Sequence, residues 1–168
     1  MRRAILAGIP VLGLVVMLQI SIASRIMLLS GNVDLLLLVV AAWGLQERVP
    51  AAWIWGAVAS LLAGLVSGVP WYIYMIGYLS VVGLARLLVH RIWQAPLLAM
   101  FAVTFIGTLE LLMLTFAQRT IFGTPLIFSE VFSQIVLPTV LLNLLLAIPI
   151  RALIRELAER LYPDKELV

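Results

Sequence analysis

Residues 49–85 read VPAAWIWGAVASLLAGLVSGVPWYIYMIGYLSVVGLA, a run of 37 positions without a charged side chain. A helix rises about 1.5 Å per residue, so about 20 residues cross the ~30 Å hydrocarbon core of a membrane. The run is long enough for nearly two such helices, and Gly68-Val69-Pro70 in its middle is typical of a turn. It therefore predicts two membrane helices, at 50–67 and 71–88, joined by a short turn.

The composition of the whole chain agrees with a membrane protein. Of its 168 residues, 64% are hydrophobic and 11% are charged, and the mean hydropathy is +1.19. A soluble domain of this size cannot bury so much apolar surface, and a disordered chain is far more polar. Cysteine is absent, which excludes disulfides and thiolate metal sites.

Further spans are predicted on both sides of this run. The 21 uncharged residues at 4–24 follow two arginines and so resemble a signal peptide, but the apolar run is longer than the ~7–15 residues usual there. More spans follow, so we expect a retained first helix. The segments 96–117 and 133–150 are also long enough to cross.

The segment 33–46 is short for a crossing helix. Two interpretations stay open: neighbouring helices shield it, or it extends back through 26–29. With this segment counted, residues 1–168 form one transmembrane domain, an all-α integral membrane bundle of six helices.

The distribution of basic residues predicts that both termini are cytoplasmic, because cytoplasmic loops carry the excess of arginine and lysine. With six spans, nine basic residues fall on one side and two on the other. If 33–46 does not span, the count is eight against three and the amino terminus lies outside. The nine are Arg2, Arg3, Arg48, Arg86, Arg91, Arg151, Arg155, Arg160 and Lys165, and the two are Arg25 and Arg119.

The third predicted helix carries a stripe of small residues at every fourth position. Such spacing lets two helix backbones approach closely in lipid. The stripe predicts either packing inside the bundle, which we favour, or docking of a helix from another protein. Its members are Ala52, Gly56, Ser60, Gly64 and Gly68.

Three polar residues are predicted at membrane depth, where such groups are costly and are functional candidates. Asp34 opens the short second span, and a surface ion pair with Arg25 is one expectation for it. Glu110 stands alone in the fifth helix, as a structural group or a proton-coupling acid. Asn143 is expected to bond a neighbouring helix or a carbonyl freed by Pro138 or Pro149, where helix kinks are expected.

A threonine stripe and an amphipathic tail complete the pattern. Thr104, Thr108 and Thr115 form a weak polar stripe on the fifth helix. Residues 151–162 predict an amphipathic continuation of the last helix, with leucines at 153, 157 and 161. It is expected either to lie on the cytoplasmic lipid surface or to receive a cytoplasmic partner. Within it, Glu156 and Arg160 have the spacing of an ion pair.

Features of an enzyme are nearly absent from the sequence. The chain has one histidine, His90, next to Arg91 at a predicted helix end. We find no metal-ligand set, paired-acid motif or phosphate loop. The sequence therefore predicts a protein that is not an enzyme and needs no metal or cofactor.

Residues 137–149 read LPTVLLNLLLAIP and carry the strongest local similarity to a known family. They resemble the final helix of the bacterial rod shape-determining protein MreD family, which the chain resembles over nearly its whole length. Residues 18–21, LQIS, and the Asp34-Leu35-Leu36 stretch are similar as well. The Gly64–Trp71 stretch keeps the family's glycines and proline but lacks its acid.

The resemblance implies a non-catalytic scaffold subunit of the cell-wall elongation machinery in the bacterial cytoplasmic membrane. It implies an MreC-like bitopic partner, a RodA-type glycosyltransferase, a class B penicillin-binding protein and, indirectly, the MreB filament. The family is also similar in fold to the substrate-binding subunits of energy-coupling-factor transporters. The alternative is therefore a solute-binding subunit of such a vitamin transporter, which would use Asn32, Asp34, Glu110 or Asn143. A proton-coupled exporter rests on Glu110 alone.

Overall fold

The computed structural model describes residues 2–47, 49, 51–91, 95–123 and 126–161, with side chains except at 2–8, 24, 90 and 91. Predictions that concern Arg48, Pro50, Tyr162 and Lys165 lie outside the described residues. Most of the described chain is helical. The helices are α1 (Arg2–Ser21), α2 (Leu35–Gly44), α3 (Ala52–Val66), α4 (Trp71–Arg91), α5 (Pro96–Ile121), α6 (Phe128–Val131) and α7 (Leu137–Leu161).

Two short irregular connections join these helices. Between α1 and α2 lie a 3-10 turn, η1 (Ala23–Arg25), and an antiparallel hairpin of β1 (Met27–Leu28) and β2 (Gly31–Asn32). A π-helical turn, η2 (Phe132–Val136), joins α6 to α7. Each predicted span falls on helical structure. The boundaries of the first five differ by a few residues, whereas the last helix extends well beyond the predicted span.

Three helical stretches of the described chain are long and apolar enough to cross a membrane. They are Trp71–Val89 in α4, Pro96–Ile121, and Phe128–Leu161, which combines α6, η2 and α7. The apolar stretches Ile9–Ser21, Leu35–Gly44 and Ala52–Val66 are shorter. The molecule therefore has the features of a membrane protein, and six crossings remain a prediction.

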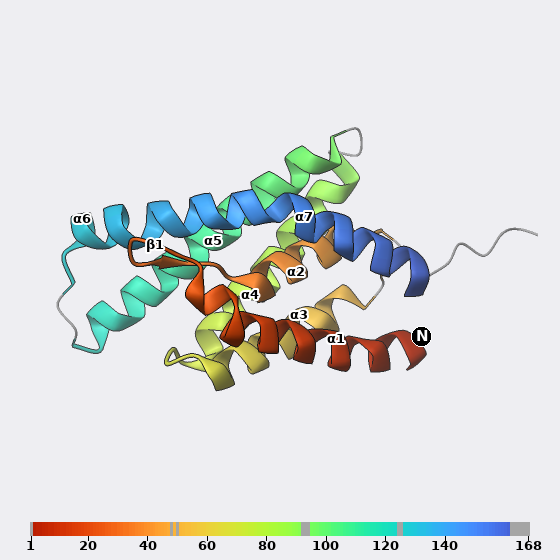
Figure 1. The fold of residues 1–168 in the computed structure, drawn as a ribbon, viewed down its shortest axis with the longest axis horizontal. Helices are drawn as coiled ribbons and strands as arrows, with labels where there is room; N and C mark the ends of the chain where they lie inside the picture. The colour runs from red at the N-terminus through yellow and green to blue at the C-terminus, as the bar shows by residue number, and fades with distance from the viewer. Residues whose placement is uncertain (1, 48, 50, 92–94, 124–125, 162–168) are drawn as a thin grey trace, which may run out of the picture.

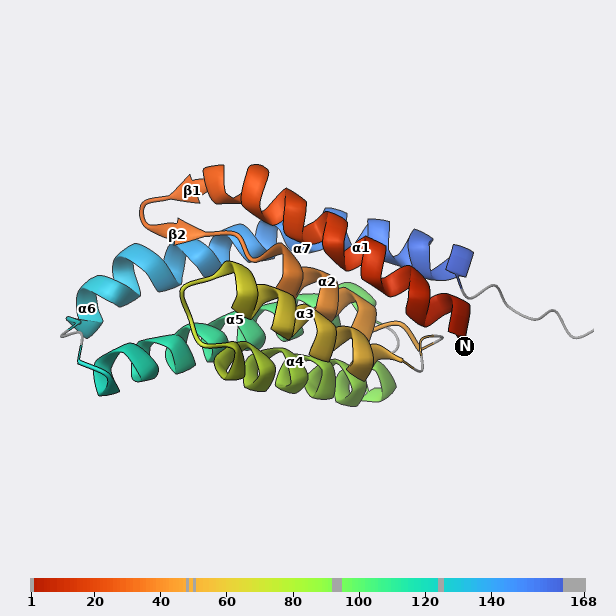
Figure 2. The same ribbon diagram turned by 90° about the horizontal axis from the view of Figure 1, so that it is seen from below.

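The connections gather at two ends of the bundle, as Figures 1 and 2 show. The hairpin, the α3–α4 turn and α6 lie at one end, which we call the hairpin end. The amino terminus and the end of α7 lie together at the opposite end. This arrangement is compatible with both termini on one side of a membrane.

Helix α2 forms the centre of the bundle (Figure 2). It has ten residues, about 15 Å of helix, and it is apolar all round, the pattern of a helix enclosed by others. All side chains of Leu36–Gly44 are buried. Of the two interpretations of the segment 33–46, shielding by neighbouring helices therefore agrees with its packing. An extension back through 26–29 is wrong, because Met27 and Leu28 form β1.

The last helix continues past the predicted span. α7 runs through Pro149 without a break and ends at Leu161, so the helix continues into the tail, as the sequence predicts, and its place on the lipid surface stays a prediction. Ile154 and Ala158 are buried in the bundle, whereas Leu153 is 65% exposed. The side of the tail that carries Ile154 and Ala158 therefore faces the bundle, and the side that carries Leu153 faces outward. The tail has this orientation because it extends a helix that already packs on α2.

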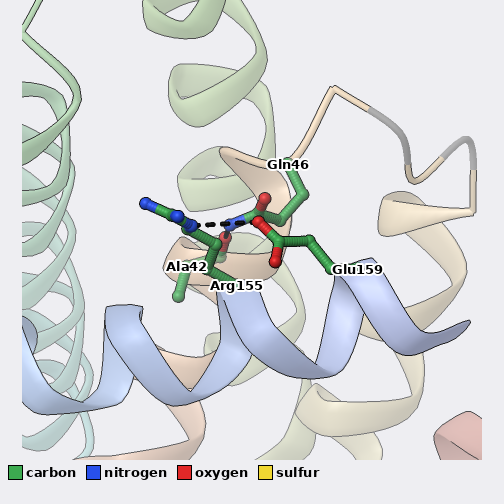
Figure 3. Close-up of polar contacts among 4 residues, drawn as sticks. All are labelled: Ala42, Gln46, Arg155 and Glu159. Carbon is green, nitrogen blue, oxygen red and sulfur yellow. Dashed lines mark hydrogen bonds and ion pairs between the residues drawn. The ribbon is translucent and has the colours of Figure 1, made fainter. Parts of the chain in front are cut away.

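Two ion pairs lie along the outward side of this tail. Arg155 Nε lies 3.0 Å from Glu159 Oε1, and Arg160 pairs with Glu156, as the spacing predicts. Figure 3 shows the Arg155–Glu159 pair beside Ala42 and Gln46 at the end of α2. Exposed pairs of this kind contribute little to stability.

Candidate functional site: a polar-lined cavity at the hairpin end

A cavity of about 600 Å³ opens within the bundle, in the half that contains the hairpin. Seven segments line it: the end of α1, the hairpin, the start of α2, the end of α3, the start of α4, the carboxyl-terminal half of α5 and the start of α7. Ligand pockets in proteins have volumes of about 300–1,000 Å³ and combine apolar walls with a few placed polar groups. This cavity has both properties.

Asp34 lines the cavity as the N-cap of α2, and we call the part of the cavity around this helix start its base. Its Oδ1 accepts a hydrogen bond from Leu37 N at 2.9 Å. Tyr78 Oη on α4 donates to the same carboxylate, 2.9 Å from Oδ1 and 3.1 Å from Oδ2. The carboxylate thus satisfies one free N–H group of the helix start and fixes α4 against it.

Asn143 on α7 is fully buried and joins three segments. Its Oδ1 accepts from Asp34 N at 2.9 Å, and its Nδ2 donates to Thr108 Oγ1 on α5 at 3.0 Å. Helix-to-helix bonding, one of the two roles expected for this amide, is confirmed.

Gln19 on α1 holds the other side of the α2 start. Its Oε1 accepts from Leu35 N at 2.7 Å, and its Nε2 donates to Val33 O at 2.7 Å. Together with Asp34 it satisfies backbone groups that would otherwise lack partners inside the bundle. At the base of the cavity, at least two hydrogen bonds therefore hold each of the side chains of Asp34, Asn143 and Gln19 in place.

The hairpin rests directly on the start of α7. Pro138 has no N–H group, so the carbonyl of Gln134 lacks its usual helical partner, and Ser30 N donates to it at 3.1 Å. Asn32 N donates to Thr139 Oγ1 at 3.2 Å. Gly31 allows this approach, because an added Cβ would lie 2.7 Å from Thr139 N. The carbonyl freed by Pro138 thus binds the hairpin instead of Asn143.

The predicted intramembrane acids separate into two environments. Asp34 lines the cavity, and Arg25 is exposed without an ion pair to it, so the expected pair is wrong. Glu110 does not line the cavity, and its Oε2 accepts from Ser80 Oγ on α4 at 2.7 Å. Glu110 therefore acts as an interhelical acceptor between α4 and α5.

The small-residue stripe of α3 faces α4. Ala52, Gly56 and Ser60 are buried, and a Cβ on Gly56 would lie 2.8 Å from Val82 Cγ2. One on Gly64 would lie 2.6 Å from Trp71 Cβ, whereas one on Gly68 would meet nothing within 4 Å. The stripe therefore packs inside the bundle, except at Gly68. Its buried members are covered within the bundle and are not available to a helix from another protein.

Several lining residues escaped the sequence analysis as site candidates. Gln19 and Tyr78 are uncharged and interrupt otherwise apolar helices, and Thr139 stands beside a proline. A polar side chain within two turns of a predicted outer helix end is the signal that was available for Gln19. Of the threonine stripe, Thr108 and Thr115 line the cavity, whereas Thr104 Oγ1 is buried without a hydrogen-bond partner among the described residues.

Within the described ranges, no three His, Cys, Asp or Glu side chains gather in a group that could hold a metal ion. Comparison of the chain with protein-family models, with curated proteins and with solved structures finds no match in any of the three.

Proposed function

We propose that this chain is a non-catalytic membrane scaffold of the bacterial cell-wall elongation machinery, which maintains rod shape by binding an MreC-like bitopic partner. Through that partner it would associate with a RodA-type glycosyltransferase, a class B penicillin-binding protein and, indirectly, the MreB filament. The similarity of residues 137–149 to the MreD family's final helix supports this assignment. So does the absence of a soluble domain between the described helices.

The observation that carries the proposal is the cavity at the hairpin end. The predicted orientation places this end outside the cytoplasm, where a bitopic partner emerges from the membrane. The cavity presents fixed polar groups, such as Asp34 and Asn143, beside apolar walls. A partner segment that leaves the membrane there would find hydrogen-bonding groups that lipid does not supply.

The test is a mild-detergent pull-down of the tagged chain from native membranes, with proteins identified by mass spectrometry. Recovery of an MreC-like protein together with wall synthases is expected. A variant with a bulky side chain in the cavity, Thr115→Trp, should lose them. The matched control is Phe105→Trp, which changes an outward-facing position of the same helix. Recovery of no elongation protein by the unmodified chain would contradict the proposal.

A second function is favoured by the same cavity: a solute-binding subunit of an energy-coupling-factor-type transporter. Its volume suits a vitamin-sized molecule, and the short helix α2 begins at its base, as broken helices do at transporter sites. A small molecule that co-purifies with the chain and is lost in Asn143→Ala supports this alternative. Glu110→Ala is the control, because Glu110 does not line the cavity.

A further inference from the structure

The cavity contains one acidic side chain and no basic side chain in its own described lining to balance it. Asp34 is the single acidic side chain among the described residues that line it, and no lysine, arginine or histidine lines it. Arg25 at the end of η1 and Arg119 in the last turn of α5 are exposed and lie outside the lining. Removing a carboxylate from water without an opposite charge costs free energy, which a bound cation would offset.

The surroundings of Asp34 suit a cation with an apolar body. A carboxylate has about four acceptor positions, and the donors described for its oxygens are Leu36 N, Leu37 N and Tyr78 Oη. The rings of Tyr74 and Tyr78 pack edge to face, with centroids 5.5 Å apart, and rings of this kind attract cations. Leu111 and Leu112 supply apolar wall.

We propose that the cavity binds an organic cation, an ammonium or guanidinium group on an apolar body, with Asp34 as its counter-charge. This inference rests on the proposed use of the cavity as a binding site and adds the chemical class of the group that enters it. Two sources share this chemistry: a free amine, or a lysine or arginine side chain of a polypeptide.

The experiment compares two probes of similar size and opposite charge, phenethylammonium and 3-phenylpropionate. The full chain is reconstituted in nanodiscs of zwitterionic lipid, and binding is followed by saturation-transfer NMR and by the shift in Tm. The ammonium probe should saturate and raise Tm, whereas the carboxylate probe should do neither. This selectivity needs no variant, so it tests the inference even where a substitution harms folding.

Asp34→Asn should weaken binding of the ammonium probe at least about tenfold, because a hydrogen bond to a charged group contributes more than a neutral one. Asparagine remains a good N-cap, so helix α2 should persist. Glu110→Gln is the matched control, since it removes an acid outside the cavity and should bind the probe like the unmodified chain. Equal binding of both probes, or unchanged ammonium binding in Asp34→Asn, would overturn the inference.

Two further readouts separate the sources. A photo-cross-linking amino acid at Asn32, which lines the cavity, should capture a polypeptide in cells, and Asp34→Asn but not Glu110→Gln should lose it. An amine recovered from the purified chain indicates a free ligand instead. If partners co-purify equally with Asp34→Asn and the ammonium probe shows no selective binding, the cation inference fails and the scaffold stands. If the amine binds but no elongation protein is recovered, the scaffold alone fails.

Discussion

The backbone N–H of Asp34 donates to Asn143 Oδ1 over 2.9 Å, across 109 positions of sequence. This bond joins the start of the shortest apolar helix, α2, to the last helix, α7. Because Asn143 also donates to Thr108 on α5, one amide fixes three segments around the base of the cavity. The site and the core of the bundle therefore depend on the same side chain.

Asn143→Leu should lower the free energy of unfolding by about 2–4 kcal/mol, because it leaves Asp34 N and Thr108 Oγ1 without partners in a buried place. Tryptophan fluorescence during denaturant titration of the detergent-solubilised chain measures this change. Thr120→Val is the control, since the Thr120 hydroxyl is exposed and donates only to Phe116 O of its own helix. Equal stability of Asn143→Leu and the unmodified chain would show that these bonds contribute nothing.

The helices of this protein were largely predictable because charge-free length and turn residues mark them. The runs at 50–67 and 71–88 each contain one helix, separated where glycine and proline interrupt them. The end of the last helix was predictable from a different signal. The leucines at 153, 157 and 161 keep a helical spacing beyond the apolar run, and α7 does end at Leu161. The burial of Ile154 and Ala158 was not predictable, because hydropathy does not report such contacts.

The cavity was only partly predictable. Asp34 and Asn143 were found because polar residues are rare in apolar helices, but a sequence does not show which of them converge. Glu110 is also a polar residue in an apolar helix, but it accepts a hydrogen bond from Ser80 outside the cavity. The hairpin that brings Asn32 onto Thr139 has two-residue strands, too short for an alternating pattern to reveal.

Gly64→Ala should destabilise the chain by about 1–3 kcal/mol, because the added methyl group would overlap Trp71 and force α3 and α4 apart. The distance to Trp71 Cβ would be 2.6 Å, well below ordinary contact. Gly68→Ala is the matched control, since nothing lies within 4 Å of its added Cβ, and it should stay within about 0.5 kcal/mol. A Gly64→Ala chain as stable as Gly68→Ala would contradict the close packing of this turn.

Gly31→Ala should loosen the hairpin from α7, because its Cβ would lie 2.7 Å from the backbone nitrogen of Thr139. Hydrogen–deuterium exchange should then become faster at Ser30 and Asn32, whose N–H groups donate to Gln134 O and Thr139 Oγ1. Gly13→Ala serves as control, since its added Cβ would meet no atom within 4 Å. Unchanged exchange at both amides in Gly31→Ala would mean that the hairpin does not need this close approach.

The topology can be tested cleanly because the chain has no cysteine, so each introduced cysteine is the single reactive thiol. The bond from Ser30 N to Gln134 O places the hairpin beside the start of the last helix, which supports a common side for both. We expect Asn32→Cys and Ser129→Cys to react with a membrane-impermeant maleimide in spheroplasts. Glu47→Cys and Glu159→Cys should react only after the membrane is opened.

The five-span alternative makes the opposite prediction at one of these positions. If 33–46 does not span and the amino terminus is outside, Asn32→Cys lies in the cytoplasm and stays unlabelled, while Ser129→Cys is still labelled. All four positions are exposed, so a difference in labelling reports sidedness rather than burial. Labelling of Asn32→Cys and Ser129→Cys together, with protection of Glu47→Cys, would establish the sidedness on which the proposed partner site depends.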